Sequence, residues 1–238
     1  MYRRQFLSLL PAIPLLGRLS QSQTVSISSA HVSINGCQHF YQMAGMGRPI
    51  VFVHGMGMSS QFFQKQLNDS AMPYQRIAYD LRGHGQTEVT ADGYTVPQFA
   101  RDLHGLLQTL NLQNAVLVGW STGTLVVLDY LSQFGNDRIA GVSLAVEPAS
   151  ELRQDNWPYG SVDDRALGDY RSVLARMTVP TLLAYGAQDV MMPLQASEYF
   201  ESHLPHAKLV VLKQRGHRPY WQEPTRFNQE LSKFIATV

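Results

Sequence analysis

The sequence predicts an α/β protein with a mostly parallel central sheet and helices on both faces. Short apolar runs bounded by turn residues alternate with longer amphipathic stretches, which is the pattern of strands alternating with helices. The runs are nearly continuous, as is typical of strands buried on both faces. A length of 238 residues suits one such domain, and 45% hydrophobic against 16% charged residues supply the apolar surface for its core.

The expected elements follow in order along the chain. The strands of the parallel part are expected at 50–53, 76–79, 115–118, 142–146, 181–185 and 209–212. Residues 25–27 and 39–42 are expected to pair antiparallel and to turn near Asn35-Gly36, because Asn-Gly favours a tight hairpin turn. Helices are expected at 96–110, 164–177, 194–203 and 225–236.

The N-terminal segment, residues 1–23, stands apart from the domain expected over 24–238. The Arg3-Arg4 pair and the short apolar stretch after it resemble a twin-arginine export signal, which predicts a periplasmic or secreted protein. Arg18 ends the apolar stretch early and no Ala-x-Ala cleavage site follows, so a flexible arm on a cytoplasmic protein is the alternative. The stretch is too short and too interrupted by proline to insert stably in a membrane.

Charge and cysteine content exclude several classes of partner. With 19 basic and 18 acidic residues the net charge is +1, so no overall field gathers nucleic acid or anionic lipid. The single cysteine, Cys37, excludes an internal disulfide and a multi-cysteine metal site. No His/Asp/Glu cluster has metal-ligand spacing and no glycine-rich phosphate loop occurs, so we expect neither a metal nor a cofactor. The sequence carries no signal for an oligomeric state.

One motif predicts a nucleophile. Residues 119–123, Gly-Trp-Ser-Thr-Gly, match the G-x-S-x-G nucleophile elbow, in which a sharp turn from strand to helix lifts the serine hydroxyl above the sheet. The motif directly follows the expected strand at 115–118 and precedes the helix-compatible stretch 125–131. This context predicts that Ser121 is a nucleophile.

Four further motifs follow expected strands in the same way. They are His54-Gly55-Met56-Gly57, Asp80-Leu81-Arg82-Gly83-His84-Gly85, Gly186-Ala187-Gln188-Asp189 and Gly216-His217. Together with the elbow, they make the chain resemble the α/β-hydrolase family over nearly its whole length after about residue 25. The order Ser121, Asp189, His217 is also the order in which that family places its catalytic triad.

The resemblance implies a role for each site residue. Ser121 would be the nucleophile, His217 the general base, and Asp189 the acid that fixes the tautomer of the histidine. The backbone N–H groups of Met56 and Thr122 would form the oxyanion hole, which leaves their side chains free to shape the pocket.

Several assignments have an alternative. Asp189 could instead cap a following helix, and Glu147, at the end of the preceding expected strand, is the rival triad acid. Trp120 and Trp157 either line the substrate pocket or only pack. His54 is expected to be a structural hydrogen-bonding residue rather than a catalytic one.

Most of the family inserts a cap domain after the sixth strand, but here residues 148–178 leave room only for a small flap. The resemblance therefore implies an open site that hydrolyses small carboxylic esters through an acyl-serine intermediate, with no cofactor. The same triad also serves perhydrolases or cofactor-free haloperoxidases, lactone hydrolases and carbon–carbon bond hydrolases. A non-enzymatic ligand receptor on the same fold is the alternative of another class.

Overall fold

The computed structural model describes residues 25–145, 171–189, 201–202, 204, 206–212 and 216–238. Several predictions concern residues outside these ranges: the segment 1–23, Glu147, Trp157, most of the interval 148–178 and most of the helix expected at 194–203.

The described residues form an eight-stranded, mostly parallel sheet, as predicted. Its strands are β1 (Ile27–Ile34), β2 (Cys37–Ala44), β3 (Pro49–Val53), β4 (Gln75–Tyr79), β5 (Ala115–Trp120), β6 (Ile139–Ala145), β7 (Thr181–Gly186) and β8 (Ala207–Leu212). Their order in the sheet is β1-β2-β4-β3-β5-β6-β7-β8. Only β1–β2 and β2–β4 pair antiparallel, while every other neighbouring pair is parallel.

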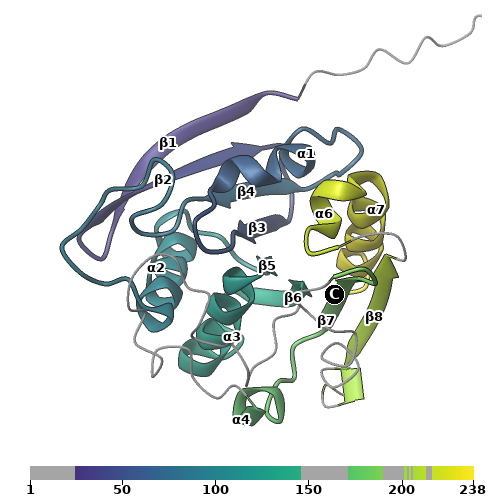
Figure 1. The fold of residues 1–238 in the computed structure, drawn as a ribbon. Helices are drawn as coiled ribbons and strands as arrows, with labels where there is room; N and C mark the ends of the chain where they lie inside the picture. The colour runs from purple at the N-terminus through teal and green to yellow at the C-terminus, as the bar shows by residue number, and fades with distance from the viewer. Residues whose placement is uncertain (1–24, 146–170, 190–200, 203, 205, 213–215) are drawn as a thin grey trace, which may run out of the picture.

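Helices cover both faces of this sheet (Figure 1). They are the 3₁₀-helix η1 (Ser60–Phe63) and the helices α1 (Gln64–Leu67), α2 (Val96–Thr109), α3 (Thr122–Phe134), α4 (Arg171–Leu174), α6 (Pro219–Gln222) and α7 (Pro224–Ile235). One core cluster joins α2, α3 and α4 to the sheet, and a second joins η1, α1, α6 and α7 to its other face. Alternate β3 residues serve the two clusters, Val51 the first and Phe52 the second, so an almost wholly apolar strand is required.

The leading hairpin is longer than predicted. Strand β1 extends to Ile34 and pairs with β2 over eight residues, from Ile27 opposite Ala44 to Ile34 opposite Cys37. The turn falls at Asn35 and Gly36, both with positive φ (48° and 72°), as the Asn-Gly signal predicts. The apolar run that predicts this strand ends at residue 27. It is short because most of β1 is exposed at the edge of the sheet and needs few apolar residues.

A buried ion pair anchors the loop that follows β4. The Arg82 guanidinium donates to both carboxylate oxygens of Asp102 on α2, at 2.9 and 3.0 Å. The Asn35 and Gln98 amides also donate to Asp102, each at 2.9 Å, and His39 Nε2 lies 3.5 Å from it. Burial raises the pKa of the Asp102 carboxyl, but His39, Arg82 and the two amides bring it down to about 2. Asp102 therefore stays ionised and connects the β1–β2 hairpin, the loop after β4 and helix α2.

We predict that Asp102→Asn lowers the free energy of unfolding by about 3 kcal/mol, because it leaves the Arg82 charge buried without a counter-ion. The folded pKa of Asp102 lies below its ordinary value of 3.8, so the unfolded chain binds more protons and the wild type loses stability as pH falls from about 4 to about 2. The variant should lack this part of the loss. Urea unfolding across that pH range measures both effects.

The control is Asp137→Asn, because Asp137 pairs with His104 at 2.9 Å but its side chain is 54% exposed. It should cost less than about 1 kcal/mol. Equal losses in the two variants would contradict the account of the buried ion pair.

Candidate active site

Ser121 makes the whole turn between β5 and α3. The strand ends at Trp120 and the helix begins at Thr122, so the serine alone takes the strained conformation, with φ 54° and ψ −129°. Such a conformation costs on the order of 1–3 kcal/mol in a residue other than glycine and persists only where the surroundings enforce it. The Ser121 carbonyl accepts from the Thr124 N–H at 2.7 Å, which closes the first turn of the helix.

The glycines on either side of the serine are required by close packing. A Cβ atom on Gly119 would lie 2.6 Å from the Gly123 carbonyl oxygen, and one on Gly123 would lie 2.1 Å from the Val53 carbonyl oxygen. Both distances are shorter than van der Waals contact. The Thr124 hydroxyl, buried beside them, bonds to the Gly119 and Ala145 carbonyls at 3.2 and 2.9 Å. Strands β3, β5 and β6 are thus joined to the start of α3 around the serine.

The two candidate oxyanion donors belong to segments that border Ser121. Thr122 is the first residue of α3, where backbone N–H groups lack a partner within the helix and the helix dipole is positive. Met56 follows Gly55, at which a Cβ atom would lie 3.3 Å from Ser121 Oγ. The Gly55–Met56 peptide therefore passes directly beside the hydroxyl.

His54 fixes the orientation of that peptide. Its Nε2 accepts from the Leu81 N–H at 3.0 Å, so Nδ1 carries the proton and donates to the Gly55 carbonyl at 2.7 Å. Burial lowers the pKa of His54 to about 3, so the ring is neutral at physiological pH. The C=O and N–H of a trans peptide point in opposite directions, so holding the Gly55 carbonyl directs the Met56 N–H away from His54. The sequence indicates a structural role for His54 but not this task.

His217 and Asp189 form a hydrogen-bonded pair. Asp189 lies three residues beyond the end of β7, in a turn closed by its N–H on the Gly186 carbonyl at 2.9 Å. Its Oδ2 is 2.9 Å from His217 Nδ1, and the two side chains are 6% and 20% exposed. With Nδ1–H held by the carboxylate, Nε2 is left as the proton acceptor.

Trp120 links this pair to the elbow. Its indole Nε1 donates to the His217 carbonyl at 2.7 Å, and its ring centroid lies 5.4 Å from that of the imidazole. The side chain is only 3% exposed and also packs on Tyr220 at 5.2 Å. Trp120, the residue before the serine, therefore holds the backbone of His217 in place.

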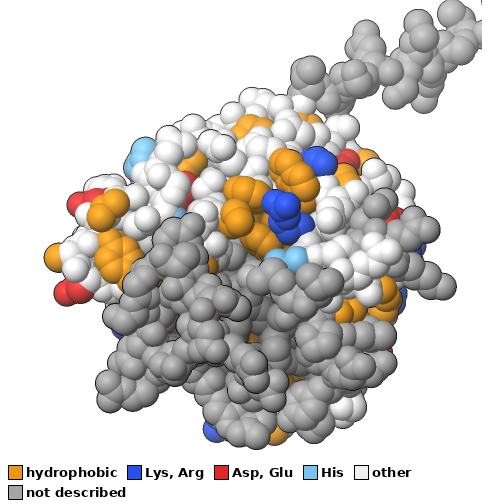
Figure 2. Space-filling model, in the orientation of Figure 1, with side chains coloured by type: hydrophobic (Ala, Val, Ile, Leu, Met, Phe, Trp, Pro, Cys, Tyr) orange, Lys and Arg blue, Asp and Glu red, His pale blue; other side chains and the backbone are white. Residues whose placement is uncertain are grey.

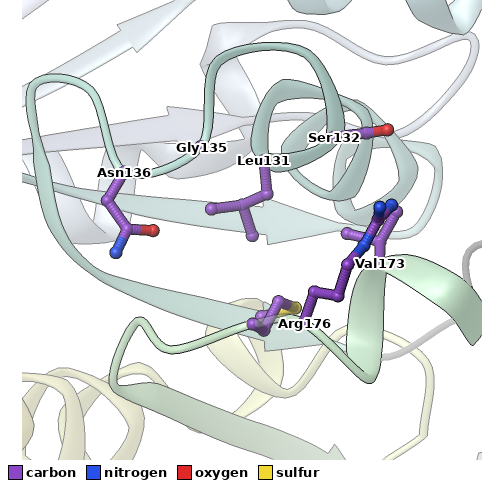
Figure 3. A pocket seen from close by; sticks show the side chains of 7 residues that line it. Leu131, Ser132, Gly135, Asn136, Val173 and Arg176 are labelled. Atoms are coloured by element: carbon purple, nitrogen blue, oxygen red, sulfur yellow. The ribbon is translucent and has the colours of Figure 1, made fainter.

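Of two pockets in the structure, one adjoins the candidate site and the other does not. A small one, about 10 Å³, is lined by Tyr185, Asp189, His217 and four neighbours, so it adjoins the acid and the histidine. A larger one, about 130 Å³, lies between the end of α3 and α4 (Figure 3) and is lined by Leu131, Ser132, Gly135, Asn136, Val173, Arg176 and Met177. It opens at the opposite end of α3 from Ser121, roughly 20 Å along the helix, and has no part in the site.

Within the described ranges, no three His, Cys, Asp or Glu side chains gather as metal ligands would. Nor is any helix among these residues long and apolar enough to cross a membrane.

Comparison with known proteins identifies the family. A family model described as alpha/beta hydrolase fold matches residues 48–163 and 146–224. The chain belongs to the α/β-hydrolase fold family. This α/β-hydrolase is 36% identical over 132 residues to the non-heme chloroperoxidase CPO-A1 of Kitasatospora aureofaciens, a match covering 55% of the chain and 48% of the relative.

Solved structures of named enzymes align over nearly the whole α/β-hydrolase. The bromoperoxidase of Bacillus anthracis superposes with a TM-score of 0.77 at 26% identity, covering 88% of this chain and all of that one. The esterase RhEst1 of Rhodococcus sp. ECU1013 superposes with a TM-score of 0.71, also at 26% identity, covering 90% of this chain and 98% of that one.

The buried neutral His54 predicts a pH dependence of stability. Its folded pKa of about 3 lies below its ordinary value of 6.5, so the unfolded chain binds more protons between the two values. Its contribution to stability is therefore full above about pH 6.5 and falls as pH drops toward 3. In His54→Asn, which does not titrate but can still donate to Gly55, this part of the loss of stability should be missing from urea unfolding curves measured between pH 7 and pH 5.

A control that changes an exposed histidine, His31→Asn, should keep the wild-type loss of stability with falling pH. A His54→Asn variant as acid-sensitive as the wild type would refute the neutral assignment.

Proposed function

We propose that this α/β-hydrolase cleaves small carboxylic esters through an acyl-serine intermediate. The observation that supports this most is the His217–Asp189 pair, 2.9 Å apart, joined through Trp120 to a serine in an enforced strained turn. A serine hydroxyl becomes a useful nucleophile only when a nearby base takes its proton, and an imidazole serves best when a carboxylate fixes its tautomer.

In the first half of the proposed reaction, Ser121 Oγ attacks the ester carbonyl while His217 Nε2 takes the hydroxyl proton. The carbonyl oxygen becomes an oxyanion and accepts from the Met56 and Thr122 N–H groups, which His54 and the helix start hold in position. The tetrahedral intermediate then breaks its bond to the alcohol oxygen. His217 gives its proton to that oxygen, and the alcohol leaves the acyl-serine behind.

In the second half, His217 takes a proton from water, and the resulting hydroxide equivalent attacks the acyl carbonyl. Collapse of the second tetrahedral intermediate returns the proton to Ser121 Oγ and releases the carboxylic acid. The Asp189 side chain holds the ring of His217 and stabilises the imidazolium that forms in each half of the reaction.

Perhydrolysis is the second candidate function, because relatives of this chain are named as a non-heme chloroperoxidase and a bromoperoxidase. In that reaction hydrogen peroxide takes the place of water in the second half and the product is a peroxy acid. The same acyl-serine serves both reactions, so the two candidates differ only in the attacking molecule.

A steady-state screen tests the proposal: aryl esters of different acyl length, with lactones and with peroxide plus acetate in parallel. We expect turnover of aryl acetates that falls by several orders of magnitude in Ser121→Ala, because the oxyanion hole cannot replace covalent catalysis. Ser132→Ala changes an exposed serine of the same helix and should behave as wild type. Fast turnover of a simple aryl ester would exclude a non-enzymatic ligand receptor, and no turnover of any ester would contradict the proposed ester hydrolysis.

The identity of the acid gives a second prediction. If Asp189 fixes the tautomer of His217, Asp189→Asn should lower kcat by roughly ten-thousand-fold, whereas Glu147→Gln should cost far less. Steady-state rates with an aryl acetate measure both variants. The opposite ranking would assign the acid to Glu147.

Acyl length gives a third prediction, based on the short interval 148–178. Each methylene group that a deep tunnel buries contributes up to about 0.8 kcal/mol, so kcat/KM would rise with chain length in such an enzyme. An open site gains little from longer chains, and we expect kcat/KM to stay level or fall beyond short acyl groups. A steady rise into long-chain esters, with a jump in rate at a lipid interface, would indicate a lipase instead.

A further inference from the structure

Three aromatic side chains, the buried Trp120 and the half-buried Phe62 and Trp221, form a continuous cluster beside the candidate site, which we call the aromatic shelf. The Phe62 ring is nearly parallel to Trp120, with an interplanar angle of 20° and centroids 6.5 Å apart. The ring centroid of Trp221 lies 6.0 Å from that of Phe62, with an interplanar angle of 47°. The shelf thus runs from the residue before the nucleophile across η1 to α6.

The outer part of the shelf is partly exposed. Phe62 and Trp221 are half-buried, as is the neighbouring Met58, and all three pack against the core. Figure 2 shows hydrophobic side chains gathered around basic ones, next to a histidine, on the face between α1 and α6. A flat aromatic group could therefore stack here without any rearrangement of the core.

The shelf adjoins His217, the residue that protonates the leaving group in the proposed reaction. The general acid must lie within hydrogen-bond reach of the oxygen that it protonates, so the leaving alcohol sits next to His217. Trp120 contacts the His217 ring, and α6, which contributes Trp221, begins two residues after His217.

The charges at the shelf are positive. The Lys65 ammonium lies 4.5 Å above the Trp221 ring and donates to the Trp221 carbonyl at 2.8 Å. Arg218, directly after His217, is exposed, and none of the carboxylates in the described part of the chain pairs with it. Neither η1, α1 nor α6 contains an acidic residue, and the nearby Glu223 pairs with Arg226 at 3.9 Å.

We propose that the substrate is an ester of an aromatic alcohol that bears an anionic group, with the ring on the aromatic shelf and the anion at Arg218. This inference rests on the proposed ester hydrolysis and adds the class of leaving group. Stacking on Phe62 and Trp221 selects a flat ring, and the exposed Arg218 guanidinium selects a negative substituent such as a carboxylate. Lys65, already held on Trp221, adds to the positive potential that the anion meets.

Two acetate esters with the same ring test the charge: 4-acetoxybenzoate, which is anionic, and 4-acetoxybenzamide, which is neutral. The quantity measured is the ratio of their kcat/KM values, which we expect to favour the anion in the wild type. An exposed ion pair of this kind contributes modestly, so Arg218→Gln should lower the ratio by about two- to fivefold. The matched control Arg226→Gln, another exposed arginine, should leave the ratio unchanged.

A second variant tests the ring. Phe62→Leu should lower kcat/KM for both aryl acetates by about two- to tenfold relative to ethyl acetate, because leucine keeps apolar contact but offers no face for stacking. Raising the sodium chloride concentration should reduce the preference for the anion in the wild type but leave the Phe62→Leu effect in place.

The outcomes separate this inference from the proposed function. Turnover of both aryl acetates with a ratio that Arg218→Gln does not change would overturn the inference and leave ester hydrolysis standing. A wild type that prefers the neutral ester would do the same. No turnover of any ester would overturn the proposed function, and the inference would fall with it.

Discussion

The close approach of β3, β5 and α3 at the elbow is the constraint on which the rest of the site depends. The Cβ positions of Gly119 and Gly123 are occupied by neighbouring backbone, so no side chain fits at either. Because β5 and α3 lie so close together, the chain turns between them within one residue, and Ser121 adopts the strained conformation. The same contact brings Gly55 against the serine, so the packing that exposes the hydroxyl also places the Gly55–Met56 peptide beside it.

Two side chains that take no part in bond making in the proposed reaction, those of His54 and Trp120, hold the neighbouring loops in position. His54 is buried and neutral, and its bonds to the Gly55 carbonyl and the Leu81 N–H tie the loop after β3 to the loop after β4. The second loop is itself held by the buried Arg82–Asp102 pair. On the other side, the Trp120 indole holds the His217 carbonyl. The candidate site is therefore positioned by neighbours that are fixed by burial and by satisfied hydrogen bonds, as preorganised electrostatic stabilisation requires.

Much of the fold and of the candidate site follows from sequence patterns that have a local physical cause. Doubly buried strands must be apolar throughout, and a hairpin with two positive φ values selects Asn35-Gly36, so these elements can be predicted. The extent of β1 could not be, because an exposed edge strand needs few apolar residues. The contacts of Thr124, Phe62 and Trp221 could not be predicted either, since they join residues far apart in the chain and a lone aromatic or threonine carries no spacing signal.

The central claim is that Ser121 becomes covalently acylated during turnover, and rapid-quench mass spectrometry with an aryl acetate tests it directly. We predict one acetyl group on the wild-type chain in the pre-steady state, located by peptide mapping on Ser121, and lost at a rate that matches kcat or exceeds it. In Ser121→Ala the adduct should be absent and turnover with it. Acetyl transfer to another residue at a rate that accounts for kcat, or undiminished turnover in Ser121→Ala, would contradict the account.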